Sequence, residues 1–192
     1  GWRLEIPGLP ELTQVGGRRG HTLDEKDFLH PSYGSGPSLV SFGSGYYTKK
    51  EFIEILKYAT DRHIRVIPEI ETPGHARAAI ASMKSRYQRL MKEGKKAEAV
   101  KYLLRDPNDK SYSISVQRQK NNVIDVAMPS TYVFLEKIID EIKLMYKAAG
   151  APLEMIHFGG DEVPAGVYAW SLTGRDLHGN LIKKHGTVNL IR

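Results

Sequence analysis

The sequence predicts an α/β fold with parallel strands. Two observations lead to this prediction: short apolar runs alternate with stretches of helical periodicity, and acidic residues and histidines follow two of the runs directly. Such alternation gives parallel strands joined by right-handed crossovers, in an open doubly wound sheet or in a closed barrel. Both architectures place their sites at the carboxyl ends of the strands. We therefore expect the polar clusters to converge on one site.

Composition limits the classes of function. The 192 residues are 41% hydrophobic and 26% charged, as expected for one globular domain. The net charge is +6, but the lysines and arginines are interspersed with Glu93 and Glu98, which indicates a solvated helix face and no nucleic-acid partner. No apolar run approaches the roughly 20 residues of a membrane span. Cysteine is absent, so a thiolate metal site and a cysteine nucleophile are excluded.

The first part of the chain, residues 1–47, is predicted to be a strand end and a long loop. Trp2–Ile6 alternates apolar and charged residues before a Pro-Gly turn. Because this run resembles the second half of a strand, we expect the chain to be part of a longer protein. Residues 9–47 are rich in glycine, proline and serine and show no helical or strand period, which indicates a loop that rims a site.

Residues 48–171 are predicted to form strand–helix units. The capping box Thr48-Lys49-Lys50-Glu51 begins a helix, and Pro129 and Gly150 bound another. The helices are expected at about 48–62, 76–93, 97–104 and 129–150. Strands are expected at 64–70 and 154–158, and residues 172–192 are predicted to be an irregular tail.

Two strand ends carry the candidate chemistry. The first is followed by Glu69-Ile70-Glu71-Thr72-Pro73-Gly74-His75, and the second runs into His157-Phe158-Gly159-Gly160-Asp161-Glu162. Adjacent carboxylates at one spot do not ionise independently, so one is held as an acid while the other stays charged. A glycine pair also accepts backbone angles that other residues avoid, and it lets a ligand approach the main chain closely. For the Asp-Glu pair taken alone, a solvated loop is the commoner interpretation.

Together these two stretches resemble the signatures of glycoside hydrolase family 20, the β-N-acetylhexosaminidases. Further similarity at Gly43–Tyr47 and Ala76–Tyr87 resembles the bacterial chitobiase-like branch. The resemblance spans residues 1–171. It implies part of a (β/α)8 TIM barrel, with Trp2–Ile6 as the end of barrel strand 2, Arg65–Ile70 as strand 3 and Met155–Phe158 as strand 4.

The resemblance also implies a substrate-assisted, retaining glycosidase that needs no cofactor. Glu162 would be the general acid, and Asp161 would orient the 2-acetamido group of the sugar. The substrates would be glycans that end in N-acetylglucosamine or N-acetylgalactosamine, a choice that the sequence leaves open. His75 and Glu71 match family positions in a hydrogen-bond network beside the acid, although the family more often has aspartate at the position of Glu71.

Three further residues are candidates for the site. His157 could support the catalytic pair, although a lone histidine on a strand is more often a core residue. Trp170 could flank the sugar, although a structural tryptophan is the commoner case. Glu69 is the third candidate.

Some features of the family's active site come from barrel strands that this sequence does not match. These are the arginine of barrel strand 1, and everything from strand 5 onward, including the tryptophan-lined acetamide pocket. We therefore expect the isolated chain to be inactive or nearly so, because proximity and a dry pocket supply much of a glycosidase's rate. Exposed barrel edges predict a homodimer. A secreted or periplasmic parent is expected from the resemblance only.

Two other functions remain open from the sequence. A metal-dependent hydrolase could use His75, His157, Asp161 and either Glu69 or Glu71, although no HExxH spacing supports it. The other possibility is a non-catalytic fragment that binds carbohydrate or serves as a scaffold.

Overall fold

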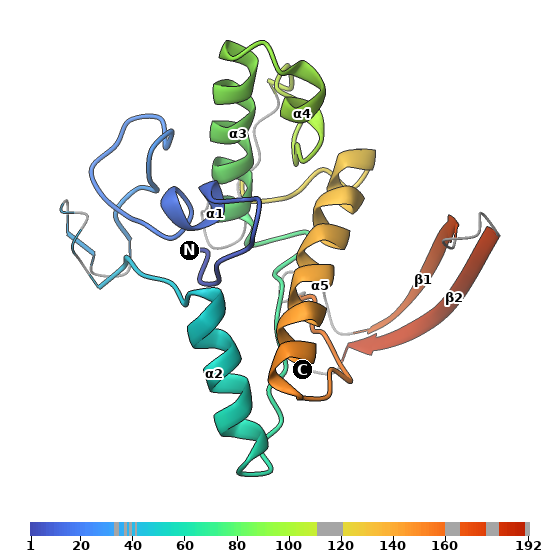
Figure 1. Cartoon of the computed structure of the whole chain (residues 1–192). Coiled ribbons are helices and arrows are strands. Elements are labelled where there is room, and N and C mark those ends of the chain that lie inside the picture. Colours follow the sequence, from blue (N-terminus) through green and yellow to red (C-terminus); the bar gives the residue numbers. More distant parts are fainter. Residues whose placement is uncertain are drawn as a thin grey trace. The chain divides into compact units, whose positions relative to one another are not determined.

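The computed structural model in Figure 1 describes residues 1–32, 35–36, 38, 40, 42–110 and 121–159, and the backbone of 166–175 and 181–190. The chain divides into two compact units, Gly1–Gly159 and Gly160–Arg192. The described residues of the first unit form five helices, and those of the second unit form a pair of strands.

Helix α2 (Lys49–Thr60) begins at the predicted capping box. The Thr48 hydroxyl accepts a hydrogen bond from the Glu51 amide at 3.2 Å, and the Glu51 carboxylate accepts one from the Thr48 amide at 2.7 Å. The Thr48 amide and the Thr48 hydroxyl, which donates to the same carboxylate at 2.8 Å, hold the pKa of Glu51 below its usual range. The box satisfies two amides that an α-helix leaves unpaired at its start, so the prediction of this helix is confirmed.

Helix α5 (Pro129–Ala149) is the longest element and also begins and ends where predicted. Proline suits its first position because the missing N–H would be unpaired there anyway. Gly150 ends the helix in the left-handed conformation, with φ of 67°, and its amide donates to the Lys147 carbonyl. Helix α2 packs against α5 within the first unit.

Among the remaining helices, α1 and α4 both pack against α3. Helix α3 (Arg77–Lys92) is confirmed, and the short helix α4 (Lys96–Val100) packs against it. Helix α1 (Glu11–Gln14) lies in the segment predicted to be loop throughout, so that prediction is wrong at this point. Leu12 of α1 is fully buried against the core, and a four-residue helix is too short to show a period in the sequence.

None of the three predicted strands forms a regular strand among the described residues of the first unit, where only isolated bridges occur. Leu4 bridges Tyr47 and Glu69 bridges His157, both in parallel orientation. Apolar side chains from these segments and from α3 and α5 form one core. In it Tyr146, 2% exposed, donates a hydrogen bond from its hydroxyl to the Val66 carbonyl at 2.9 Å.

The second unit corrects the prediction of an irregular tail at 172–192. Strands β1 (Gly166–Arg175) and β2 (Leu181–Leu190) pair antiparallel, with Tyr168 opposite Val188. Lys183 and Lys184 are adjacent in β2, so apolar and polar residues do not alternate and the sequence carries no strand period. Backbone pairing requires no such alternation.

No helix in the described part of the chain is long and apolar enough to cross a membrane.

Candidate functional site

The two strand ends singled out in the sequence lie side by side. The His157 amide donates to the Pro68 carbonyl at 2.9 Å, and the Ile70 amide donates to the His157 carbonyl at 2.8 Å. A third bond runs from the Thr72 amide to the Phe158 carbonyl at 3.2 Å. The first two bonds have the pattern of parallel strands, whereas the third departs from it, because a regular parallel pair would use the Gly159 carbonyl. The predicted convergence of the two segments is therefore confirmed as far as Gly159.

Gly159 meets Glu71 at the end of this pairing. Its φ of 67° is a left-handed conformation that residues with a Cβ rarely adopt. A Cβ at this position would overlap the Glu71 carboxylate and lie 3.3 Å from the Glu71 Cα. The positive φ therefore favours glycine here, as expected of the glycine pair, and a Cβ would also force the Glu71 side chain to move.

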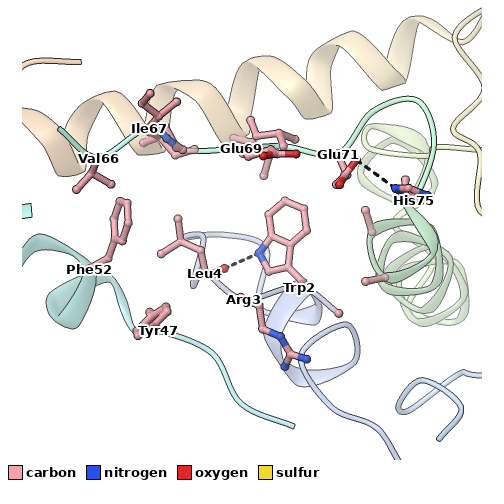
Figure 2. A pocket seen from close by; sticks show the side chains of 18 residues that line it. Trp2, Arg3, Leu4, Tyr47, Phe52, Val66, Ile67, Glu69, Glu71 and His75 are labelled. Carbon is pink, nitrogen blue, oxygen red and sulfur yellow. Dashed lines mark hydrogen bonds and ion pairs between the residues drawn. The ribbon is translucent and has the colours of Figure 1, made fainter. Parts of the chain in front are cut away.

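Glu71 also faces His75 across a tight turn. The Glu71 Oε2 and the His75 Nδ1 are 3.5 Å apart, with side chains 38% and 20% exposed (Figure 2). His75 has a φ of 50°, which is uncommon for a residue other than glycine. Two backbone bonds hold the turn, one from the Ile124 amide to the Pro73 carbonyl and one from the Ala76 amide to the Asn122 carbonyl, both at 2.8 Å.

His157 contacts groups of both segments. Its Nδ1 accepts a hydrogen bond from the Gly159 amide at 3.2 Å and lies 3.4 Å from the Glu69 Oε2. The His157 side chain is 52% exposed, so His157 is not the core histidine that was weighed as the alternative.

A cavity of about 350 Å³ adjoins this edge. Glu69, Glu71 and His75 contribute to its wall, and most of the remaining wall is apolar, including Trp2 and Leu4 (Figure 2). The Trp2 indole donates to the Leu4 carbonyl at 2.5 Å. The sequence interpretation did not assign these two residues to the site, although their i, i+2 spacing on an extended segment places both on one face.

The structure thus gathers four of the seven predicted residues: Glu69, Glu71, His75 and His157. Asp161 and Glu162 lie outside the described residues. Trp170 belongs to the second unit, where only its backbone, on β1, is described. Within the described residues, no group of three His, Asp or Glu is placed to hold a metal ion, and any ligand set that includes Asp161 extends beyond them.

Comparison with known proteins decides the family. The family model for the catalytic domain of glycosyl hydrolase family 20 matches residues 1–185. The chain belongs to this family.

Two of the similar relatives of this family 20 chain are enzymes of Vibrio species. The chain is 55% identical over 163 residues to the N,N'-diacetylchitobiase of Vibrio harveyi, and 49% identical over 162 residues to a β-hexosaminidase of Vibrio vulnificus. Each alignment covers 84% of the chain but only 18% and 19% of those relatives. The chain thus spans about a fifth of their length.

Solved structures agree with the family and give the fold. An inactive mutant of the family 20 exo-β-N-acetylglucosaminidase of Vibrio harveyi aligns with a TM-score of 0.64 and 34% identity, covering 85% of this chain and 21% of that one. The N-acetyl-β-hexosaminidase of Streptomyces plicatus aligns with a TM-score of 0.51 and 31% identity, over 84% and 24% of the two chains. The family 20 chain is therefore part of a TIM-barrel catalytic domain.

Proposed function

We propose that this chain is the part of a β-N-acetylhexosaminidase that carries its catalytic carboxylates. The parent enzyme would remove terminal non-reducing N-acetyl-β-hexosamine units from glycans by a substrate-assisted, retaining mechanism. The observation that supports this most directly is the pairing of the His157–Gly159 segment with the Pro68–Thr72 segment, immediately before Asp161 and Glu162. The names of the relatives and the family match support the same activity.

In the proposed reaction the carbonyl oxygen of the sugar's own acetamido group attacks the anomeric carbon. Glu162 gives its proton to the departing glycosidic oxygen, so the glycosidic bond breaks and a cyclic oxazolinium ion forms. Asp161 accepts a hydrogen bond from the acetamido N–H and stabilises the positive charge. Water then opens the ring and returns a proton to Glu162. One carboxyl must begin protonated and the other charged, which adjacent carboxylates favour.

The described residues would support this pair. The Glu71–His75 contact lies at the end of the segment that pairs with His157, so a proton network beside Glu162 is the role we propose for it. His157 would fix the turn toward Asp161 through the Gly159 amide, with Glu69 as its neighbour. Trp170 stays a candidate for the wall of the sugar site.

The finer assignment of barrel strands belongs to the same proposal. We assign Arg65–Ile70 to barrel strand 3 and Met155–Phe158 to strand 4, because consecutive strands of such a barrel are parallel neighbours and the Glu69–His157 bridge is parallel. Trp2–Ile6 would be the end of strand 2.

A non-catalytic role for the isolated chain is the second candidate. Ile67, Met155 and Phe158 are 45%, 50% and 40% exposed on the proposed strands, so apolar surface remains to be covered. The missing barrel strands or a second copy of the chain would cover it, and the proposed homodimer rests on this surface. A periplasmic or secreted location of the parent is proposed on the family resemblance alone.

Release of an aryl group from an aryl N-acetyl-β-glucosaminide tests the function. The chain, Glu162→Gln and the control Glu154→Gln would be compared, since Glu154 is an exposed carboxylate paired with Arg65 at 2.9 Å. A substrate without the acetamide is the chemical control. Turnover that needs both Glu162 and the acetamide supports the proposal, and turnover that survives Glu162→Gln contradicts it. Sugar binding without turnover by the folded chain would favour the second candidate.

A further inference from the structure

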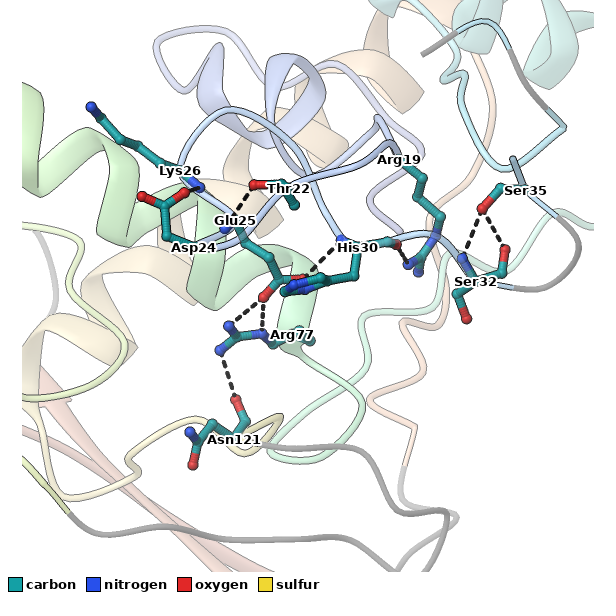
Figure 3. A network of polar contacts seen from close by, with 10 residues as sticks. All are labelled: Arg19, Thr22, Asp24, Glu25, Lys26, His30, Ser32, Ser35, Arg77 and Asn121. Carbon is teal, nitrogen blue, oxygen red and sulfur yellow. Dashed lines mark hydrogen bonds and ion pairs between the residues drawn. The ribbon is translucent and has the colours of Figure 1, made fainter. Parts of the chain in front are cut away.

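A partly buried ion pair, with Glu25 buried and the Arg77 side chain 34% exposed, joins the long loop to the start of α3 (Figure 3). The Glu25 side chain is 6% exposed, and its Oε2 accepts hydrogen bonds from Nε of Arg77, at 2.6 Å, and from Nη2. The two residues are 52 positions apart in the chain. The Glu25 backbone has a φ of 53°, a conformation that costs energy and persists only where the surroundings hold it.

The carboxylate is satisfied on both oxygens. Its Oε1 accepts from the His30 amide at 3.1 Å, and the His30 Nδ1 lies at the same distance. Burial acts to raise the pKa of Glu25, but the Arg77 charge and these hydrogen bonds outweigh it and hold the pKa below its usual range. Glu25 is therefore charged at neutral pH, and its ion pair with Arg77 is maintained.

Arg77 links a third segment to this pair. It is the first residue of α3, two positions after His75, and its Nη1 donates to the Asn121 carbonyl at 3.4 Å. The next residue, Asn122, accepts the Ala76 amide through its carbonyl. One guanidinium thus contacts the loop around Glu25 and the segment whose backbone bonds to the turn of His75.

We infer that Glu25 and Arg77 are positioning residues for the proposed reaction, holding the His75 turn so that its imidazole faces Glu71. The left-handed backbone of His75 needs such external support, because it is disfavoured for a residue with a Cβ. Arg77 supplies this support from the adjacent helix turn, and Glu25 fixes Arg77. The expected effect on turnover rests on the proposed function, whereas the expected effect on the His75 turn rests only on the described contacts.

Alternatively, the ion pair could serve only to attach the loop around Glu25 to α3. In that case a substitution should loosen the loop alone, whereas in the positioning role it should also loosen the turn of His75. Glu25→Gln keeps the shape of the side chain and removes the charge that Arg77 contacts. Arg77→Lys keeps the charge but not the planar group that reaches both Glu25 and Asn121. Asp24→Asn is the matched control, because Asp24 is the neighbouring carboxylate and accepts only the Lys26 amide among the described contacts.

Amide hydrogen exchange and steady-state kinetics of the whole chain test the inference. In Glu25→Gln and in Arg77→Lys, we expect exchange at residues 74–76 to accelerate at least about tenfold, the scale of a lost hydrogen bond to a charged group. With the aryl N-acetyl-β-glucosaminide, kcat should fall by a similar factor while KM stays nearly constant. Asp24→Asn should change neither quantity.

Two results would overturn the inference: faster exchange confined to residues 22–30 in both variants, or an unchanged kcat in a chain that turns the substrate over. If one variant does not fold, the other still decides the question. A wild-type chain without turnover would count against the proposed function for the isolated chain, while exchange at residues 74–76 would still decide whether the ion pair holds the His75 turn.

Discussion

Gly159 lies so close to the Glu71 carboxylate that a side chain on residue 159 would collide with it. The two residues come from different segments, and a Cβ on Gly159 would occupy the space of the Glu71 Oε2. Close approach of this kind is one of the two reasons for which a fold requires glycine, and the positive φ of Gly159 is the other.

Gly159→Ala should therefore destabilise the chain by about 2 to 4 kcal/mol, from strained backbone and overlap together. Gly94→Ala is the matched control, because Gly94 has a φ of 76° but open space around its Cα. It should cost only about 1 kcal/mol, from backbone strain alone. Denaturant unfolding of both variants measures the difference, and equal losses would contradict a steric role for Gly159.

Tyr146→Phe should lower the free energy of unfolding by about 1 to 2 kcal/mol, because it leaves the Val66 carbonyl without its partner inside the core. Tyr132→Phe removes a similar bond, from the Tyr132 hydroxyl to the Val126 carbonyl at 2.9 Å, from a side chain that is 59% exposed. Water replaces the lost bond there, so the change should stay within about 0.5 kcal/mol. Thermal unfolding of the two variants provides the comparison.

Glu25→Gln should change how stability depends on pH. The pKa of Glu25 is lower in the folded chain than its ordinary value of 4.5, so its charged form stabilises the fold. This contribution is fully present above pH 4.5 and is lost as the pH falls through the lowered pKa. At pH 7 the variant should be about 2 kcal/mol less stable than wild type, and the gap should narrow in acid.

Glu54→Gln is the control for that titration, because Glu54 is 63% exposed and lies 4.0 Å from Lys50. Its effect should stay within about 0.5 kcal/mol at neutral pH. A gap between Glu25→Gln and wild type that does not narrow below pH 4.5 would show that the charge of Glu25 adds nothing to folding.

If the chain turns over the aryl N-acetyl-β-glucosaminide, His75→Asn should reduce this turnover by roughly a hundredfold, the lower end of a typical acid–base contribution. Asparagine tolerates the left-handed backbone, so the change addresses the imidazole and not the turn. His63→Asn makes the same substitution at an exposed histidine with a φ of 57° and should leave turnover unchanged. Similar losses at both positions would argue against a specific role for His75.

The sequence could predict the features that depend on neighbouring residues. The ends of α2 and α5 follow from Thr48, Glu51, Pro129 and Gly150, because caps act within one helical turn. The meeting of the two strand ends was predictable as well, because alternating strands and helices bring carboxyl ends to one edge.

Contacts between residues far apart in the sequence, and elements without a hydrophobic period, were not predictable. Glu25 and Arg77 lie 52 positions apart, and no spacing in the sequence links them. Helix α1 is shorter than any periodic signal, and β2 pairs with β1 through backbone groups, which the choice of side chains reveals only weakly.

The space that Gly159 leaves for Glu71 also fixes how the two segments can align. The bridge pairs Glu69 with His157, and Gly159, two residues further on, lies against Glu71. A slip of one residue in register would set the side chain of Phe158 against the Glu71 carboxylate and turn each side chain of the segment to the other face. Gly159 therefore favours the alignment of the two described segments in which Glu69 pairs with His157.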